Sequence, residues 1–292
     1  MMRLVALVLL LGVTATVAVA VGRMTWRNRS EGLRDALAHA TAVRATAVRA
    51  TAAFDTTELE GLPAPVARMF RTTLTPGQPL ITSVQLAHRG TFDMGRDDVR
   101  WAPFASSQYV SARRPGFLWD ARIRMGPGLP VFVHDAYIAG RGVLTAKLLG
   151  LITVMNADQD EALAEGEFLR WVAEAAWYPT ALLPSQGAVW APRDDASATL
   201  TFRDGRLTAT VTVSFDRQGR IARVRADRRT RLTPDGPVPT PWEGRFWDYV
   251  QRDGMWIPRQ GEVAWLLPDG PRAYWRGEMV TATYAFERAA PR

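Results

Sequence analysis

The chain has 292 residues and no cysteine, which excludes disulfides, thiolate nucleophiles and cysteine metal sites. Its formal net charge is +7, but residues 1–50 hold seven arginines and two acidic residues, so the other 242 residues hold 29 basic and 27 acidic groups and carry only +2. This near-neutral remainder argues against nucleic-acid binding, and its length fits one large β-rich domain better than two small ones.

The N-terminus predicts a membrane anchor. Residues 4–22 contain no charged side chain, and 19 helical residues nearly cover a hydrocarbon layer of ~30 Å. We expect residues 1–29 to form a transmembrane helix with a basic flank, which places the protein at the cell membrane with a single pass. A signal peptide cleaved near Ala18-Val19-Ala20 is the alternative. The arginines after the segment favour a cytoplasmic domain and a signal anchor favours the outside, so the side stays open.

Residues 30–58 are expected to form a spacer between the anchor and the domain. Three related pentapeptides begin at Ala40, Ala45 and Ala50. A period of five matches neither a helix nor a strand, so the segment offers no continuous apolar face. Its arginines either rest on anionic lipid headgroups or are solvated.

A single β-rich domain is predicted for residues 59–292. It begins with a short amphipathic helix, because apolar residues recur at helical spacing from Val66 to Leu74. Alternation of apolar and polar residues then predicts half-buried strands at residues 84–92 and 117–125.

The middle of the domain combines further strands with the most regular helix after the anchor. Strands are expected at residues 131–138 and 143–153, although the second segment is apolar enough for a helix. Residues 158–178 have helical periodicity. The apolar face of this helix consists of Phe168, Leu169, Trp171, Val172, Ala175 and Ala176.

The opposite side of the same helix carries Glu167, Arg170 and Glu174, spaced so that Arg170 can bridge both carboxylates. We expect this triad to form a solvated, salt-bridged face, with binding of a charged headgroup as the alternative. Glu165 projects toward the apolar side instead. It is either a buried proton carrier or a first-turn carboxylate that interacts favourably with the helix dipole.

The C-terminal third predicts a series of antiparallel hairpins. Asp-Gly pairs favour the positive φ angles of tight hairpin turns, and here they separate stretches rich in Val, Thr and aromatic residues. The four pairs are Asp204-Gly205, Asp235-Gly236, Asp253-Gly254 and Asp269-Gly270.

Two side-chain patterns accompany these strands. Alternation places Trp247 and Tyr249 on one side of their strand. The second pattern is a basic stripe of Arg223, Arg225, Arg229 and Arg231 together with Asp227. We expect the stripe to face solvent, with contact to an anion or headgroup as the alternative.

No motif in the sequence identifies a reaction. The chain lacks a Gly-x-Ser-x-Gly nucleophile elbow, a His-Glu-x-x-His helix and a phosphate-binding glycine-rich loop. His88 and His134 alternate with apolar neighbours and are expected to face inward, whereas His39 lies in the spacer. With Asp93 or Asp135 they could form a metal or acid-base site, but hydrogen-bonded core histidines are expected, and neither a metal nor a cofactor is predicted.

Several motifs of the domain occur together. They are Leu62-Pro63-Ala64-Pro65-Val66, Phe168-Leu169-Arg170-Trp171, Trp177-Tyr178-Pro179-Thr180-Ala181-Leu182-Leu183-Pro184, Pro241-Trp242-Glu243-Gly244 and Tyr274-Trp275-Arg276. Their combination resembles an uncharacterised family of bacterial membrane-anchored proteins over residues 60–287. That family has no established activity, so the resemblance implies no catalytic residue. In topology alone, the order of elements is also similar to lipoprotein carriers and sorting factors, whose half-open barrel holds acyl chains.

The predicted fold is mainly β (α+β), a curved antiparallel sheet or half-barrel around one or two helices, preceded by the transmembrane helix. We expect the domain to bind a hydrophobic small molecule or lipid without covalent chemistry. The expected ligand-binding residues are Trp119, Trp171, Trp177, Trp247 and Tyr249.

Two alternatives remain open. One is an enzyme that uses Glu165 with His88 or His134 as proton carriers in the same pocket. The other is a protein-interaction module at the membrane, whose aromatic patch docks a partner. No nucleic-acid partner is expected in any of these readings.

Overall fold

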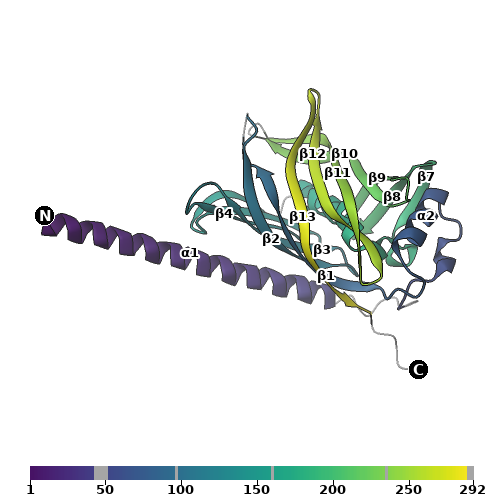
Figure 1. Cartoon of the computed structure of the whole chain (residues 1–292), viewed down its shortest axis with the longest axis horizontal. Coiled ribbons are helices and arrows are strands. Elements are labelled where there is room, and N and C mark those ends of the chain that lie inside the picture. Colours follow the sequence, from purple (N-terminus) through teal and green to yellow (C-terminus); the bar gives the residue numbers. More distant parts are fainter. Residues whose placement is uncertain (43–51, 96–97, 159–160, 234–235, 288–292) are drawn as a thin grey trace.

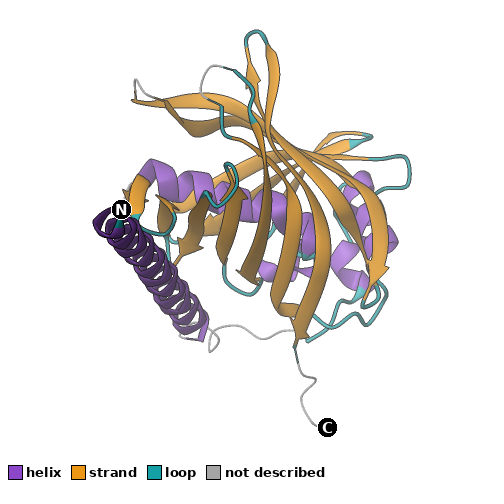
Figure 2. Ribbon diagram, turned by 60° about the vertical axis from the view of Figure 1, so that its left-hand side comes forward, coloured by secondary structure: helices purple, strands orange, loops and turns teal. Residues whose placement is uncertain are grey.

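A computed structural model describes residues 1–42, 52–95, 98–158, 161–233 and 236–287. Its centre is one antiparallel sheet of 13 strands in the order β6-β5-β4-β3-β2-β1-β13-β12-β11-β10-β9-β8-β7. The sheet is strongly curved and bends around helix α3 (Figures 1 and 2). The predicted mainly β fold, with a curved antiparallel sheet around helices, is confirmed.

The strands are β1 Ile81–Asp93, β2 Trp101–Ser111, β3 Gly116–Arg124, β4 Pro130–Ile138, β5 Arg141–Leu148, β6 Ile152–Asp158, β7 Val189–Asp194, β8 Ser197–Asp204, β9 Leu207–Phe215, β10 Ile221–Thr233, β11 Gly236–Arg252, β12 Met255–Leu267 and β13 Gly270–Phe286. The α-helices are α1 Met2–Ala42, α2 Ala64–Thr73 and α3 Glu161–Ala173. Short 3-10 helices are η1 Thr56–Leu59, η2 Glu174–Trp177, η3 Pro179–Leu182 and η4 Pro184–Gln186.

The sheet consists of two meanders. Consecutive strands pair from β1 through β6, and consecutive strands pair from β7 through β13. The meanders meet where β1 pairs with β13, with Gly90 opposite Gly277. Helix α3 leads the chain from β6 at one edge of the sheet to β7 at the other.

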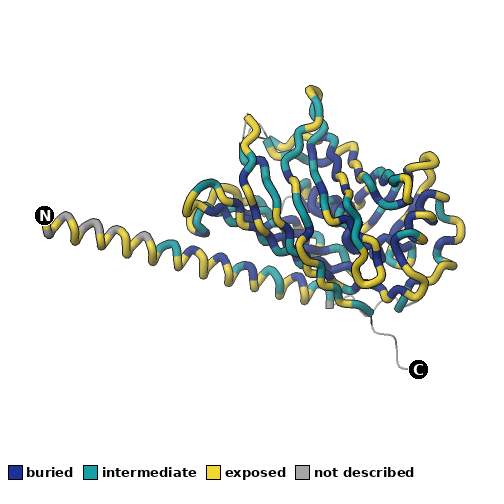
Figure 3. The backbone as a smooth tube through the Cα atoms, viewed as in Figure 1, coloured by how far each residue is buried: buried dark blue, intermediate teal, exposed yellow. Residues whose placement is uncertain are grey.

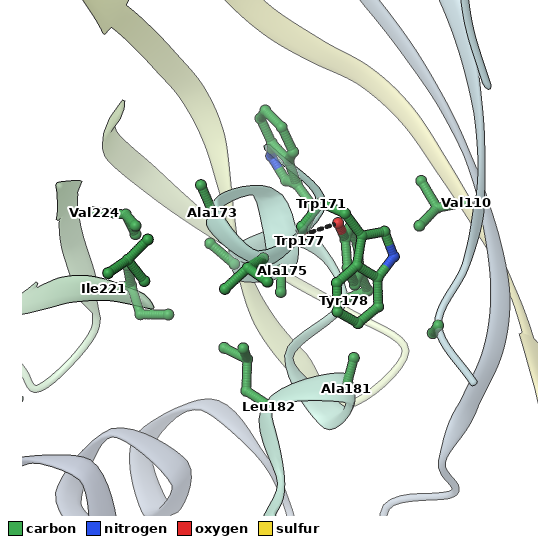
Figure 4. Packing of buried hydrophobic residues seen from close by; sticks show 14 of the residues in the cluster. Val110, Trp171, Ala173, Ala175, Trp177, Tyr178, Ala181, Leu182, Ile221 and Val224 are labelled. Carbon is green, nitrogen blue, oxygen red and sulfur yellow. Dashed lines mark hydrogen bonds between the residues drawn. The ribbon is translucent and has the colours of Figure 1, made fainter. Parts of the chain in front are cut away.

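Helix α3 and the turns after it fill most of the space under the sheet. Phe168, Trp171 and Tyr178 are almost completely buried, and Figure 4 shows the aromatic and aliphatic side chains packed around them. The Tyr178 hydroxyl donates to the Trp171 carbonyl at 2.5 Å, the dashed line in Figure 4. The helix predicted for residues 158–178 therefore exists but is shorter, because the chain tightens into η2 and then meets Pro179.

The ambiguous segment at residues 143–153 is a β-hairpin and not a helix. The segment contains the paired strands β5 and β6 and the turn between them. Leu149 and Gly150 form this turn, with φ angles of 57° and 75°. Two consecutive positive φ angles are typical of the tight turns that match strand twist.

The hairpins predicted at Asp-Gly pairs are confirmed where the structure describes both residues. Asp204-Gly205 joins β8 to β9, and Asp269-Gly270 joins β12 to β13. At the β11–β12 turn, Asp253 and Gly254 have φ angles of 47° and 82°. Asp235 lies outside the described residues.

Helix α1 packs on the outer face of the sheet, opposite to α3. The Trp26 indole stacks on the His134 ring with centroids 3.8 Å apart. The Ser30 hydroxyl lies 2.7 Å from His134 Nε2 and donates to Asp120 Oδ2 at 2.7 Å. The helix continues into the predicted spacer and ends at Ala42.

The N-terminal half of α1 projects beyond the sheet (Figure 1), and its described side chains are mostly exposed (Figure 3). Within the described parts of the chain, no helix is at once long enough and apolar enough to cross a membrane.

Candidate functional site

A cavity of about 110 Å³ lies between the concave face of the sheet and the C-terminal end of α3. Its wall includes the aromatic rings of Trp119, Trp177, Trp242, Phe246, Tyr274 and Trp275. These rings come from strands β3, β11 and β13 and from η2, so both meanders contribute to the wall.

The Trp275 ring lies close against the sheet because glycines surround it. A Cβ atom on Gly277 would lie 2.3 Å from this ring, and one on Gly261 would lie 3.5 Å from it. Gly90, Gly277 and Gly261 are register partners across β1, β13 and β12. This row of glycines makes the room that the indole occupies beside the cavity.

A buried ion-pair network forms the charged part of the cavity wall. Arg170 Nη1 donates to Asp135 Oδ2 at 2.6 Å, and Arg170 Nε donates to Glu174 Oε1 at 2.7 Å. Gln108 Nε2 donates to the other oxygen of Glu174 at 2.5 Å. Arg170 therefore links α3 to strand β4 directly, and it is linked to strand β2 through the Glu174 carboxylate.

A second guanidinium, that of Arg229, enters from strand β10. Arg229 Nη2 donates to Glu167 Oε1 at 3.3 Å, and Arg229 Nη1 donates to the Tyr274 hydroxyl at 3.3 Å. The Trp242 indole N–H donates to the same hydroxyl at 2.9 Å. The prediction that Arg229 faces solvent with the other arginines of its stripe is wrong. Strand β10 has one extra residue between Ala226 and Arg229 relative to β11, and this bulge turns Arg229 inward.

The polar side of α3 is buried, so the prediction of a solvated face is wrong. Glu167 is only 4% exposed, whereas Glu165 is exposed to solvent. The physical reason is the position of α3 inside the curve of the sheet, where strands cover both its apolar and its polar side. The direction predicted for Glu165 is therefore wrong as well.

Burial and the nearby charge of Asp135 raise the pKa of Glu167 well above its ordinary range, and they outweigh the opposite effect of Arg229. With a proton on Glu167, the two guanidinium groups face two ionised carboxylates, those of Asp135 and Glu174. The network is then neutral overall, which lowers the cost of burying it.

The guanidinium groups also occupy the faces of the cavity rings. Arg170 lies 5.3 Å from the centroid of Trp119, and Arg229 lies 5.1 Å from the centroid of Trp242. Aromatic rings attract cations through their faces. Because the protein's own arginines use these faces, the cavity is a poor site for a cationic ligand.

Several buried polar atoms around the cavity have no hydrogen-bond partner among the described residues. They include Nε1 of Trp119 and of Trp275, Oδ1 of Asp135 and both ring nitrogens of His88. His88 lies between Trp177 and Trp275, with ring centroids 4.9 Å and 5.9 Å away. Burial, helped by the charge of Arg170, lowers the pKa of His88 to about 3, so this ring is neutral at physiological pH.

The structure brings together some of the residues predicted to bind a ligand and separates others. Trp119 and Trp177 line the cavity. Trp171 is buried in the neighbouring core and donates its indole N–H to the Ser111 carbonyl. Trp247 is 43% exposed, and Tyr249 packs under Arg220, so these two do not line the cavity. Asp248 between them has a φ angle of 56°, which interrupts the regular alternation of β11.

The predicted proton carriers do not form one site. His88 faces the inside of the sheet as predicted, but the inward direction predicted for His134 is wrong. His134 shares the outer face of β4 with α1, whereas its neighbour Asp135 points to Arg170 on the inner face. Among the described residues, no group of three His, Asp or Glu side chains is arranged to hold a metal ion.

Four side chains that line the cavity are not among the residues expected to bind a ligand: Arg229, Trp242, Tyr274 and Trp275. The sequence offered a signal for the last three, because they lie in the motifs Pro241-Trp242-Glu243-Gly244 and Tyr274-Trp275-Arg276. For Arg229, the alternation of its strand predicted the solvent face, whereas the side chain is buried on the inner face.

The profile of a family of unknown function, DUF6920, matches residues 60–284 of the chain. Comparison with curated protein sequences gives no match. Among solved structures, a LolA superfamily protein from Nitrosomonas europaea is 11% identical with a TM-score of 0.38, and the alignment covers 78% of this chain and 94% of that one. A putative outer membrane lipoprotein-sorting protein domain from Vibrio parahaemolyticus is 10% identical with a TM-score of 0.37, covering 69% and 84%. A beta-barrel-like protein of domain of unknown function DUF1849 from Brucella abortus is 11% identical with a TM-score of 0.22, covering 70% and 99%.

Proposed function

The chain belongs to the family of unknown function DUF6920, and we propose that its domain binds a hydrophobic ligand, without covalent chemistry, in the cavity between the sheet and α3. One observation carries this proposal: a hollow lined by several aromatic rings lies inside an otherwise closely packed core. Apolar walls with a few fixed polar groups are typical of small-molecule sites.

The polar atoms of the wall favour a ligand with an uncharged polar group. The buried indole N–H groups of Trp119 and Trp275 lack acceptors among the described residues, and each unmet donor costs about 1–3 kcal/mol. A hydroxyl or carbonyl oxygen on the ligand would supply an acceptor. An ion would add an uncompensated charge to a network that is already neutral.

The volume of the cavity limits what enters it. About 110 Å³ corresponds to roughly four water molecules at about 30 Å³ each, and it lies below the range of ~300–1,000 Å³ that holds drug-sized ligands. We therefore propose a short ligand, or one end of a longer chain. A complete lipid tail would require the sheet to move away from α3.

A cavity-filling variant tests the proposal. Ala173 lines the cavity and is buried, so Ala173→Leu places a larger apolar side chain in the hollow. Small molecules extracted from the purified full-length chain are identified by mass spectrometry for the wild type and for this variant. We expect a hydrophobic compound to accompany the wild type and to be lost from Ala173→Leu.

Trp247→Phe is the matched control, because this ring is exposed and lies outside the cavity. It should retain the compound. Extracts of the wild type that are empty after expression in several hosts would count against ligand binding, and so would equal retention by Ala173→Leu at unchanged thermal stability.

We further propose that α1 tethers the domain to the cell membrane. The support comes from the sequence, in which residues 4–22 carry no charge, and from the exposure of apolar side chains such as Val13 and Val17. Carbonate extraction of membranes from expressing cells tests this tether. The protein should stay in the pellet, and a variant that lacks residues 1–22 should appear in the supernatant.

A further inference from the structure

A second concave site lies on the outer face of the sheet, in the angle between α1 and strands β2, β3 and β4. This groove has a volume of about 660 Å³, within the range of ligand sites. Three of its arginines, Arg23, Arg27 and Arg34, come from α1, and Arg122 comes from β3. It is separate from the cavity, because α1 and α3 lie on opposite faces of the sheet.

The groove has an excess of positive charge. Its two acidic side chains are Glu31, which pairs with Arg27 at 3.7 Å, and Asp120. Asp120 is already used by α1, since it accepts from the Trp26 indole at 3.1 Å and from the Ser30 hydroxyl at 2.7 Å. No arginine pairs with Asp120 among the described residues, and four arginines against two carboxylates leave the groove with a net charge of +2.

Three of the arginines are left without an acidic partner among the described residues. Arg23 and Arg122 are exposed and make no ion pair within that part of the chain. The guanidinium of Arg34 stacks on the Tyr109 ring at 4.2 Å, and its Nε is buried without a hydrogen-bond partner. Guanidinium groups are the preferred partners of phosphate oxygens, so each of these arginines offers the groove a phosphate-binding group.

Several contacts dock α1 on the sheet and so fix the two walls of the groove. Arg29 Nη2 donates to the Thr145 hydroxyl at 3.0 Å, and Arg114 Nη1 donates to the Ala40 carbonyl at 3.0 Å. Leu37 packs against Leu118 and Ala136. The backbone positions that carry the arginines of α1 and the arginine of β3 are therefore fixed relative to one another.

The position of the groove along α1 indicates where its ligand comes from. Arg23 directly follows the uncharged segment of residues 4–22. Apolar side chains immediately before it are exposed, with Val17 at 55% and Val21 at 47%. An apolar helix that ends at a basic groove is suited to a bilayer surface, where acyl chains end at headgroup phosphates.

We propose that this groove binds the phosphate of an anionic phospholipid headgroup. Arg122 is the residue that distinguishes this site from a general basic flank of the anchor, because it belongs to the sheet and lies about 100 residues further along the chain. Binding at the groove would orient the domain relative to the membrane.

The test compares two arginines of one strand. Both Arg122 and Arg124 are exposed on β3, but only Arg122 lines the groove. The full-length chain is placed in nanodiscs of phosphatidylcholine and phosphatidylglycerol in known proportion. It is then recovered by detergent exchange, and the phospholipids that remain bound are quantified by mass spectrometry.

We expect phosphatidylglycerol to be enriched on the wild type relative to the nanodisc. Arg122→Gln should reduce the enrichment about 5-fold, which corresponds to the ~1 kcal/mol of one arginine near anionic lipid. Arg124→Gln should leave it unchanged, and both variants should keep the melting temperature of the wild type.

Two results would overturn the proposal. One is an equal effect of Arg122→Gln and Arg124→Gln, whether a loss or none. The other is stabilisation by inorganic phosphate in detergent, abolished by Arg122→Gln, while the retained lipids have the composition of the nanodisc. That second result would assign the groove to a soluble phosphate instead.

Discussion

Arg229 Nη2 lies 3.3 Å from Glu167 Oε1 inside the curved sheet, although Arg223 and Arg225 of the same strand are exposed to solvent. The bulge of β10 before Arg229 produces this contact, since it shifts the strand by one residue against β11. A single inserted residue thus determines which side chains face the cavity.

Replacing Arg229 should destabilise the domain strongly. Arg229→Met leaves the carboxylates of Asp135 and Glu174 with one guanidinium, so we expect the free energy of unfolding to fall by about 3–5 kcal/mol. The neighbouring Arg228 is exposed, and Arg228→Met should change this free energy by less than about 0.5 kcal/mol. Urea unfolding followed by tryptophan fluorescence measures both. Similar values for the two variants would show that the buried network contributes little.

Glu167→Gln should change how stability depends on pH. The folded protein keeps the Glu167 proton above the ordinary pKa near 4.5, whereas the unfolded chain releases it there, so rising pH favours unfolding by up to about 1.4 kcal/mol per pH unit. Glutamine carries no such proton. The variant and the wild type should be similarly stable at pH 4, and the variant more stable at pH 8. A difference that is constant across this range would mean that Glu167 is ionised in the folded state.

His88 should make the domain sensitive to acid. Its pKa is about 3 in the folded state and about 6.5 in the unfolded chain, so between these values only the unfolded chain takes up the proton. Stability is therefore complete above pH 6.5 and falls as the pH drops toward 3. In His88→Leu the decline over this window should be smaller by up to about 1.4 kcal/mol per pH unit. His39→Leu, at an exposed position of α1, is the control and should follow the wild type.

Trp26 should hold α1 on the sheet. It is buried between α1 and His134, and removing a large buried aromatic side chain typically costs about 3–5 kcal/mol. We expect Trp26→Ala to release α1, so that the amides of residues 26–40 exchange hydrogen faster while those of the sheet remain protected. Met24→Ala changes an exposed residue two positions earlier in α1 and should leave exchange unaltered. Unchanged exchange in Trp26→Ala would show that other contacts suffice for docking.

The sequence predicted the elements of the fold better than the environment of α3. Alternation in β1 and β3 and the Asp-Gly turns are local properties, and local properties identified these strands correctly. The burial of Glu167 and Arg170 is a tertiary property, because it depends on a sheet that curves around both sides of one helix. Periodicity alone assigns such polar residues to solvent, and so it assigned the ion-pair network to the wrong environment.

The candidate site could be predicted only in part for a similar reason. Trp119 was identified because its strand alternates regularly, whereas the bulge before Arg229 and the positive φ at Asp248 break the rule that assigns faces. His134 points to the outer face of the sheet and is nevertheless buried, because Trp26 and Ser30 of α1 cover it. Without α1 this face of β4 would be exposed to solvent.

The pairing of β1 with β13 has a consequence for synthesis on the ribosome. Strand β1 emerges early, but its partner on one side is the last strand of the domain, about 190 residues later. Until β13 leaves the exit tunnel, β1 presents an open edge of unpaired amides and carbonyls, which is a template for association between nascent chains. Each meander can assemble locally, yet the pairing in the middle of the sheet forms only after β13 has been synthesised.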